Sequence, residues 1–485
     1  MLFTEPLFLF LFLPCLICLY FGLPPRFRNA LLTAASLAFF AVGEPGFLPW
    51  LLASILINYW IALAMVAQRG AGTGRARQLL IVGIVSDLLL LLVFKYADFF
   101  CANLNIVLQT WHGRTLPLPH LALPLGISFF TFHKISYKVD VYRNQASVRR
   151  NPLDLALYIL LFPQLIAGPI VRYHDIADQL LRRIVTSHDF AVGIRRFIVG
   201  FGKKMLIANI AAGAADAIFA LPAHALATDI AWLGAICYML QIYFDFSAYS
   251  DMAIGLARMF GFRFPENFNY PYIATSITDF WRRWHMSLSR WFRDYVYIPL
   301  GGNRHGPLRT YLNLLIVFFL CGLWHGASWN FVAWGLFHGA FLVIERLGQG
   351  QWLALLPRPL RHAYTLLVVM VGWVLFRADN LPHALAYLGA LSSIGQGPRT
   401  SADFPLSMYL PPERILMLAA ACVGAAPLLP QLARWLDGAQ TQKAPMGQRA
   451  WIAASIRIAA LLTVFWLSAA QVAAGTYNPF IYFRF

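Results

Sequence analysis

Two histidines, His325 and His285, are the residues of this apolar chain best suited to chemistry. His325 follows Trp324 between two long hydrophobic stretches, and His285 follows Trp284 further upstream. Ionisable side chains at bilayer depth cost free energy and are usually retained for function, and imidazole accepts and returns a proton near neutral pH. The pair therefore predicts a membrane enzyme that moves protons. The alternative is that neighbouring backbone groups simply satisfy each ring.

The composition predicts a polytopic helical membrane protein. Of the 485 residues, 59% are hydrophobic and 12% are charged, and the mean hydropathy is +0.61. Soluble domains carry about 25% charged residues. Several apolar runs approach the roughly 20 residues that a helix needs to cross the hydrocarbon. Long continuous runs favour helices over a barrel, because barrel strands alternate between apolar and polar residues.

The apolar runs predict an all-α fold of about eleven to thirteen helices, some of them re-entrant or interfacial. The runs are 6–23, 29–42, 47–67, 79–97, 121–137, 153–171, 205–221, 230–260, 308–325, 329–347, 362–377, 413–429 and 450–474. Prolines interrupt several of them, and broken helices are tolerated where they line a polar cavity inside the protein. We expect one transmembrane domain, 1–485, with its catalytic core at about 120–347 and C-terminal helices and a tail at 360–485.

The net charge of +17 indicates a partner for the basic residues. They fall in loops between apolar runs, as at Arg75, Arg149 and Arg195, which fits the positive-inside rule and contact with lipid headgroups in a bacterial inner membrane. The basic residues form no aromatic-interleaved stripe, so nucleic acid is excluded as a partner. The histidines lack the ligand spacing of a zinc site, and we expect neither a metal nor a bound cofactor.

The segment 261–307 carries most of the polar side chains. Ser276 or Thr278, followed by Asp279, predicts a helix start. Beyond it, aromatic residues recur at helical spacing with arginines between them, which predicts an interfacial amphipathic helix. Arg282 and Arg283 could then bind a phosphate-bearing donor while His285 points into the protein. The alternative is a surface helix with its tryptophans at headgroup level.

Two acids, Asp245 and Asp251, lie in an otherwise apolar run. Their separation does not place both on one face of a straight helix, so a catalytic carboxyl pair is a poor interpretation. We expect each acid to pair with an arginine of 282–293. His133 is a further candidate for the same polar cavity, ranked below His285 and His325.

Five motifs together resemble the membrane-bound O-acyltransferase (MBOAT) family, and within it the bacterial alginate O-acetyltransferase branch. They lie at 243–253, 266–269, 279–285, 297–302 and 324–326. The resemblance implies a ring of tilted helices around a central funnel, where an acyl group crosses from a cytoplasmic donor to an extracytoplasmic acceptor. It also implies that His325 is the catalytic histidine and that His285 occupies the position of the second active-site residue.

Acetyl transfer from a thioester to a hydroxyl requires a base for the hydroxyl proton and hydrogen-bond donors for the developing oxyanion. A neutral His325 can be the base. His285, an indole N–H of Trp281 or Trp324, or Asn330 could supply the donors. Acetyl-CoA is the expected source of the acetyl group.

The tail at 478–485 is rich in aromatic residues and follows a polar break. It could anchor the chain at the headgroups or dock a partner. It also resembles a segment of bacterial acyl-transfer assemblies in which a tyrosine hydroxyl is a candidate acyl relay. Tyr482 is therefore a relay or docking candidate, since phenoxide, with a pKa of about 10, leaves an ester more readily than an alkoxide does.

We expect an inner-membrane O-acetyltransferase subunit that acts on an extracytoplasmic polysaccharide such as alginate, together with a periplasmic acyltransferase partner. The alternatives are O-acetylation of cellulose or peptidoglycan, D-alanyl transfer from a carrier protein, and a non-catalytic scaffold or channel of a polysaccharide export complex.

Overall fold

The structure is a computed structural model that describes residues 1–69, 74–113, 115–392, 404–428, 430–431 and 448–481. Over these residues all regular structure is helical, so the predicted all-α class is confirmed. Within the same residues, eight helices are long and apolar enough to cross a membrane. They cover Pro45–Ala67, Arg75–Trp111, Ser187–Phe219, Thr228–Met259, Gly306–His325, Trp329–Gly348, Arg358–Arg377 and Ala454–Ala473.

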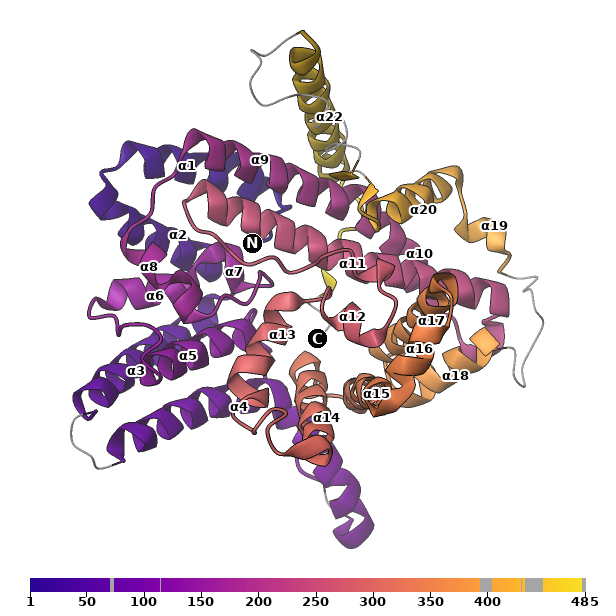
Figure 1. Cartoon of the computed structure of the whole chain (residues 1–485), viewed down its shortest axis with the longest axis horizontal. Coiled ribbons are helices and arrows are strands. Elements are labelled where there is room, and N and C mark those ends of the chain that lie inside the picture. Colours follow the sequence, from indigo (N-terminus) through magenta and orange to yellow (C-terminus); the bar gives the residue numbers. More distant parts are fainter. Residues whose placement is uncertain (70–73, 114, 393–403, 429, 432–447, 482–485) are drawn as a thin grey trace.

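The helices form a ring around the centre of the molecule, with short helices and the N-terminus near the middle (Figure 1). The first half comprises α1 (Leu13–Gly22), α2 (Arg28–Gly43), α3 (Leu48–Ala67), α4 (Arg75–His112), α5 (Ile127–Tyr142), α6 (Pro152–Leu160), α7 (Phe162–Leu165), α8 (Tyr173–Leu181), α9 (Ser187–Gly202), η4 (Lys203–Ala208) and α10 (Asn209–Phe219). The second half comprises α11 (Thr228–Met259), α12 (Ile277–Trp281), α13 (Met286–Phe292), η7 (Arg293–Tyr297), α14 (Gly306–His325), α15 (Trp329–Ile344), α16 (Gly350–Leu355), α17 (Arg358–Arg377), α18 (Leu381–Ser392), α19 (Leu406–Tyr409), α20 (Pro412–Gly424) and α22 (Gln448–Ala473). The run 153–171 is broken between α6 and α7, as its prolines predicted.

The helix α11 is the central wall of the ring. It is largely buried and packs against α9, α10, α17 and α18. Glycines allow the close approach of α9, since a Cβ at Gly200 would lie 2.7 Å from the carbonyl oxygen of Ala248 on α11. Small residues at such contacts let helix backbones pack tightly in an apolar solvent. The result is a fixed scaffold between the two sides of the molecule.

One side of the ring gathers arginines through contacts between distant segments. Arg69 binds Asn144 at 2.5 Å, Arg143 and Arg172 both reach Asp294, and Arg258 binds Asp189. The loops after α3 and α5 therefore meet there, and α8 connects them to the segment after α11, because Arg263 N donates to Gln179 Oε1 and Arg172 pairs with Asp175. We call this the basic face. The opposite ends of α2 and α5, at 43–44 and 123–128, lie on the other face.

The predicted amphipathic helix over 280–293 is wrong. Two short helices, α12 and α13, are separated by a turn in which His285 has φ 42°, a left-handed backbone that non-glycine residues rarely adopt. The loop before it holds the turn, because Asn267 O accepts from Met286 N at 2.9 Å. The aromatic side chains are buried on several sides of the turn. Their spacing reflected burial in the protein rather than one lipid-facing stripe.

Candidate active site

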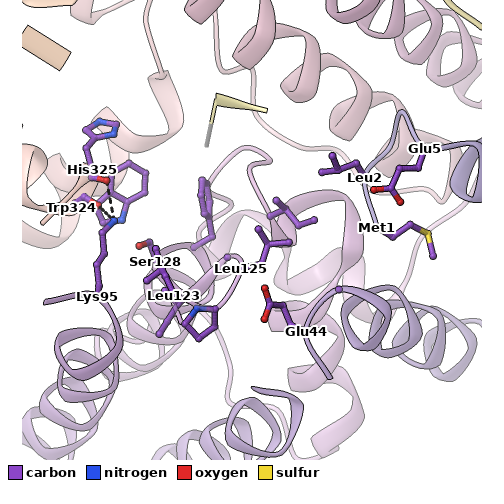
Figure 2. Close-up of a pocket in the computed structure, with 16 residues that line it drawn as sticks. Met1, Leu2, Glu5, Glu44, Lys95, Leu123, Leu125, Ser128, Trp324 and His325 are labelled. Atoms are coloured by element: carbon purple, nitrogen blue, oxygen red, sulfur yellow. Dashed lines mark hydrogen bonds between the residues drawn. The ribbon is translucent and has the colours of Figure 1, made fainter. Parts of the chain in front are cut away.

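The last residue of α14 is His325, which lines a cavity of about 300 Å³. The helix ends there because Gly326 is extended, with φ −164°, and α15 then turns back along α14. The other lining residues are Met1, Leu2, Glu5, Gly43, Glu44, Lys95, Leu123, Pro124, Leu125, Gly126, Ile127, Ser128, Phe129, Ile166 and Trp324. Figure 2 shows His325, Trp324 and Lys95 on one side of the cavity, and Glu5 and Glu44 across from them.

The imidazole of His325 lies in an aromatic box. Its ring centroid is 4.8 Å from that of Trp324 and 5.0 Å from those of Trp334 and Phe376. The ring is buried, and its Nδ1 has no hydrogen-bond partner among the described residues. Most buried polar atoms are hydrogen-bonded, so an unpaired imidazole nitrogen beside a cavity needs an explanation. The alternative that neighbouring backbone groups satisfy the ring is therefore wrong for His325.

The second histidine, His285, is fully enclosed and fixed by Asn267. Asn267 Oδ1 accepts from Ser287 N at 3.2 Å and lies 3.0 Å from Nδ1 of His285. The backbone donor identifies that atom as oxygen, so Nδ1 of His285 carries the proton. Burial lowers the pKa of His285 to about 3, and its neutral ring therefore presents an unprotonated Nε2. In this state His285 accepts a hydrogen bond instead of donating one.

The two histidines belong to one cluster, because Trp324 contacts both. Its ring lies 4.8 Å from His325 and 6.1 Å from His285 between centroids. Ser276 caps α12 as the sequence predicted, accepting from Asp279 N at 3.0 Å, and the turn beyond it directs His285 inward. His285 is 1% exposed, which confirms that it points into the protein.

Indole N–H groups are the free donors near the histidines. Nε1 of Trp281, Trp324 and Trp334 is buried with no acceptor among the described residues. Trp334 was missed by the sequence reasoning, which had no signal to separate it from core aromatics. Asn330 is occupied elsewhere, since its Nδ2 donates to Ala378 O at 2.6 Å. Of the two indoles expected as oxyanion donors, that of Trp324 lines the cavity and that of Trp281 does not.

The arginines proposed to bind a donor do not line the cavity. Arg282 is exposed, and Arg283 pairs with Asp279 at 2.9 Å. His133 is also absent from the cavity wall, and its ring packs 5.5 Å from that of Tyr158. Of the cavity-lining side chains, sequence reasoning missed Lys95, although a charge inside the run 79–97 was a usable signal.

The predicted pairing of the two acids of α11 with arginines of 282–293 is wrong. Asp251 binds Arg196 at 2.9 Å and Lys203 at 2.7 Å. Asp245 binds Lys204 at 2.8 Å. The reason is that α9 and η4 pack along α11. Their basic side chains therefore lie beside the two acids, where the arginines of 282–293 were expected.

The C-terminal tail enters the protein instead of lying at the headgroups. Ile481 N donates to Asp245 Oδ2 at 2.9 Å, and Asn209 binds Asn478 at 3.1 Å. Lys204 also donates to the carbonyl oxygen of Pro479. Ile481 is buried and shares a narrow space with His325, Trp334 and Trp373. The headgroup-anchor alternative is therefore wrong for the tail up to this residue. Tyr482 lies outside the described residues.

Most of the chain is similar to known proteins. The model of the membrane-bound O-acyltransferase family matches residues 47–378. The chain is 44% identical to the probable alginate O-acetylase AlgI of Azotobacter vinelandii over 100% of both chains. It is 40% identical to the peptidoglycan O-acetyltransferase of Helicobacter pylori, over 80% of this chain and 79% of the relative. It is 32% identical to the teichoic acid D-alanyltransferase of Bacillus subtilis, over 48% of this chain and 63% of the relative.

Proposed function

Since this chain belongs to the membrane-bound O-acyltransferase family and is a multi-pass membrane acyltransferase, we propose that it transfers acetyl groups for O-acetylation of an extracytoplasmic polysaccharide. The observation that carries the proposal is the unpaired imidazole of His325 beside a cavity of about 300 Å³. The donor is acetyl-CoA, and alginate is the polysaccharide favoured by the full-length match to the relative from Azotobacter vinelandii.

The orientation follows from the basic face. The positive-inside rule assigns that face to the cytoplasm of a bacterial inner membrane. The cavity is lined by 43–44 and 123–128, at the opposite ends of α2 and α5, and it therefore opens toward the acceptor. The donor approaches from the cytoplasm, and the exposed Arg282 can bind one of its phosphates.

In the reaction, a hydroxyl oxygen attacks the thioester carbonyl carbon while His325 removes the hydroxyl proton. The new C–O bond forms, the C–S bond breaks, and the proton passes from His325 to the leaving thiolate. The products are an ester and a free thiol. The indoles of Trp324 and Trp281 stabilise the oxyanion, and such donors are worth several kcal/mol in a water-excluded site. His285 does not line the cavity, and its Nε2, which has no partner among the described residues, accepts a hydrogen bond from a reacting group that reaches it beside Trp324.

The tail supplies a relay. Docking of Asn478 through Ile481 brings the chain to the space beside His325, which supports Tyr482 as an acyl carrier. The acetyl group moves first to the phenol oxygen, releasing the thiol, and then to an acceptor hydroxyl, restoring the phenol. A phenyl ester keeps much of the reactivity of the thioester. The acceptor is a periplasmic acyltransferase partner that completes transfer to the glycan.

The test uses membrane vesicles that contain the full chain, with acetyl-CoA labelled in its acetyl group. His325→Ala should lower transfer of label by about 10²–10⁴-fold, the usual cost of losing a general base. His133→Gln is the matched control, since His133 is also buried but does not line the cavity, and it should stay near wild type. Retention of more than about a tenth of the activity by His325→Ala would refute the role of the base. A D-alanyl carrier-protein thioester, offered in parallel, separates the two donor classes.

A further inference from the structure

Lys95 is a charged residue within the membrane-spanning helix α4. Its ammonium reaches the cavity beside Trp324 and His325 (Figure 2). A charge at this depth is costly and is kept only where partners stabilise it. The proposed acyl transfer gives Lys95 no proton to move and no bond to make. Its presence therefore needs a separate explanation.

The partners of Lys95 are the carbonyl groups at the end of α14. Nζ donates to Trp324 O at 2.5 Å and to His325 O at 3.1 Å. The next residue, Tyr96, donates from its hydroxyl to Leu323 O. The last four carbonyls of a helix have no partner within it, and unsatisfied carbonyls are costly where water is excluded. Two neighbouring residues of α4 thus cap three successive carbonyls of α14.

The other described lysines make a different contact. Lys134 and Lys138 pair with Asp87, Lys203 pairs with Asp251 and Lys204 with Asp245, each within 3.0 Å. Lys95 alone among the described lysines has no carboxylate within 4.0 Å there. Within the part of the chain that the structure describes, the hydrogen bonds of Lys95 go only to the backbone that carries His325. The role of Lys95 in this membrane helix is therefore to be sought at that backbone.

We infer that Lys95 is a positioning residue that fixes the end of α14 and thereby holds His325 at the cavity. The inference rests on the proposed function, since it assumes that His325 is the base. An unfixed helix end frays over its last turn, and a displacement of about 1 Å at a reacting group can cost about 10²-fold in rate. The loss falls on kcat, because the hydrogen bonds of Lys95 go to the backbone that carries the base.

The first experiment removes the donors and keeps the packing. In membrane vesicles with labelled acetyl-CoA, Lys95→Met should lower kcat by about 30–100-fold and leave the KM for acetyl-CoA within about twofold. Tyr96→Phe is the matched control, since it removes one cap from the same helix end but leaves the two carbonyls nearest the base satisfied. It should lose less than about threefold. A wild-type kcat in Lys95→Met, or a loss confined to KM, would overturn the inference.

The second experiment restores the donor chemically. Lys95→Ala leaves space at the cavity wall, and ethylammonium, which has three N–H donors, should raise its kcat at least about tenfold. Tetramethylammonium, which has no N–H donor, should not. If Lys95→Met does not accumulate, Lys95→Ala made in ethylammonium decides: rescue supports positioning, and folded protein without rescue contradicts it. Activity in His325→Ala would instead refute the proposed function itself.

Discussion

The contacts that Asp245 makes with the C-terminal tail give a prediction whose magnitude follows from the distances. Asp245 is 1% exposed, pairs with Lys204 at 2.8 Å and accepts from Ile481 N at 2.9 Å. Asp245→Asn keeps the shape and an acceptor oxygen but removes the charge. A hydrogen bond to a charged group is worth about 1.5–3 kcal/mol, against about 0.5–1.5 kcal/mol for a neutral one. The difference of about 1–1.5 kcal/mol corresponds to roughly tenfold more undocked tail.

Hydrogen–deuterium exchange of the full chain in lipid nanodiscs measures that population. The amide of Ile481 should exchange about tenfold faster in Asp245→Asn, while peptides of α14 and α15 keep their wild-type rates. Asp251→Asn is the matched control, because Asp251 lies on the same helix and binds Arg196 and Lys203. It should leave the tail unchanged. Wild-type exchange at Ile481 in Asp245→Asn would show that the carboxylate does not hold the tail.

Three further predictions concern the site and the basic face. His285→Ala, which removes the Nε2 acceptor, should lose at least about 10²-fold in labelled acetyl transfer, whereas His285→Gln, whose side-chain oxygen can accept a hydrogen bond, should retain more activity than His285→Ala; unchanged activity in both variants would exclude His285 from the site. Tyr482→Phe removes only the hydroxyl and should abolish glycan acetylation in cells; wild-type acetylation would exclude the relay. The hydrogen bond to Asp140 raises the pKa of His174, so the stabilisation from this pair is complete below about pH 6.5 and is lost as pH rises through the raised folded value. Thermal unfolding of His174→Gln should therefore differ from wild type more at pH 6 than at pH 9, and an equal difference at both would contradict the pairing.

The sequence was sufficient for the class of protein and for the histidine that we propose as its base. Long apolar runs have few structural solutions in lipid, and helices are the one that continuous runs allow. An imidazole at bilayer depth is costly, so His325 could be proposed as a candidate without knowing what surrounds it. The predicted helix start at Ser276 is also confirmed, because Ser276 and Asp279 are close in the chain and their hydrogen bond needs no distant partner.

Contacts between distant segments decided the rest. The left-handed backbone of His285 depends on Asn267, in a loop that the spacing of aromatic residues does not reveal. The partner of Asp245 was Lys204, because α9 and η4, not the arginine-rich turn, lie along α11. Lys95 lies at the site because α4 packs against the end of α14, a contact that the sequence does not reveal. Charge and hydrophobicity act at each position and can be read along the chain, whereas the partner of a buried polar group is fixed by which helices pack together.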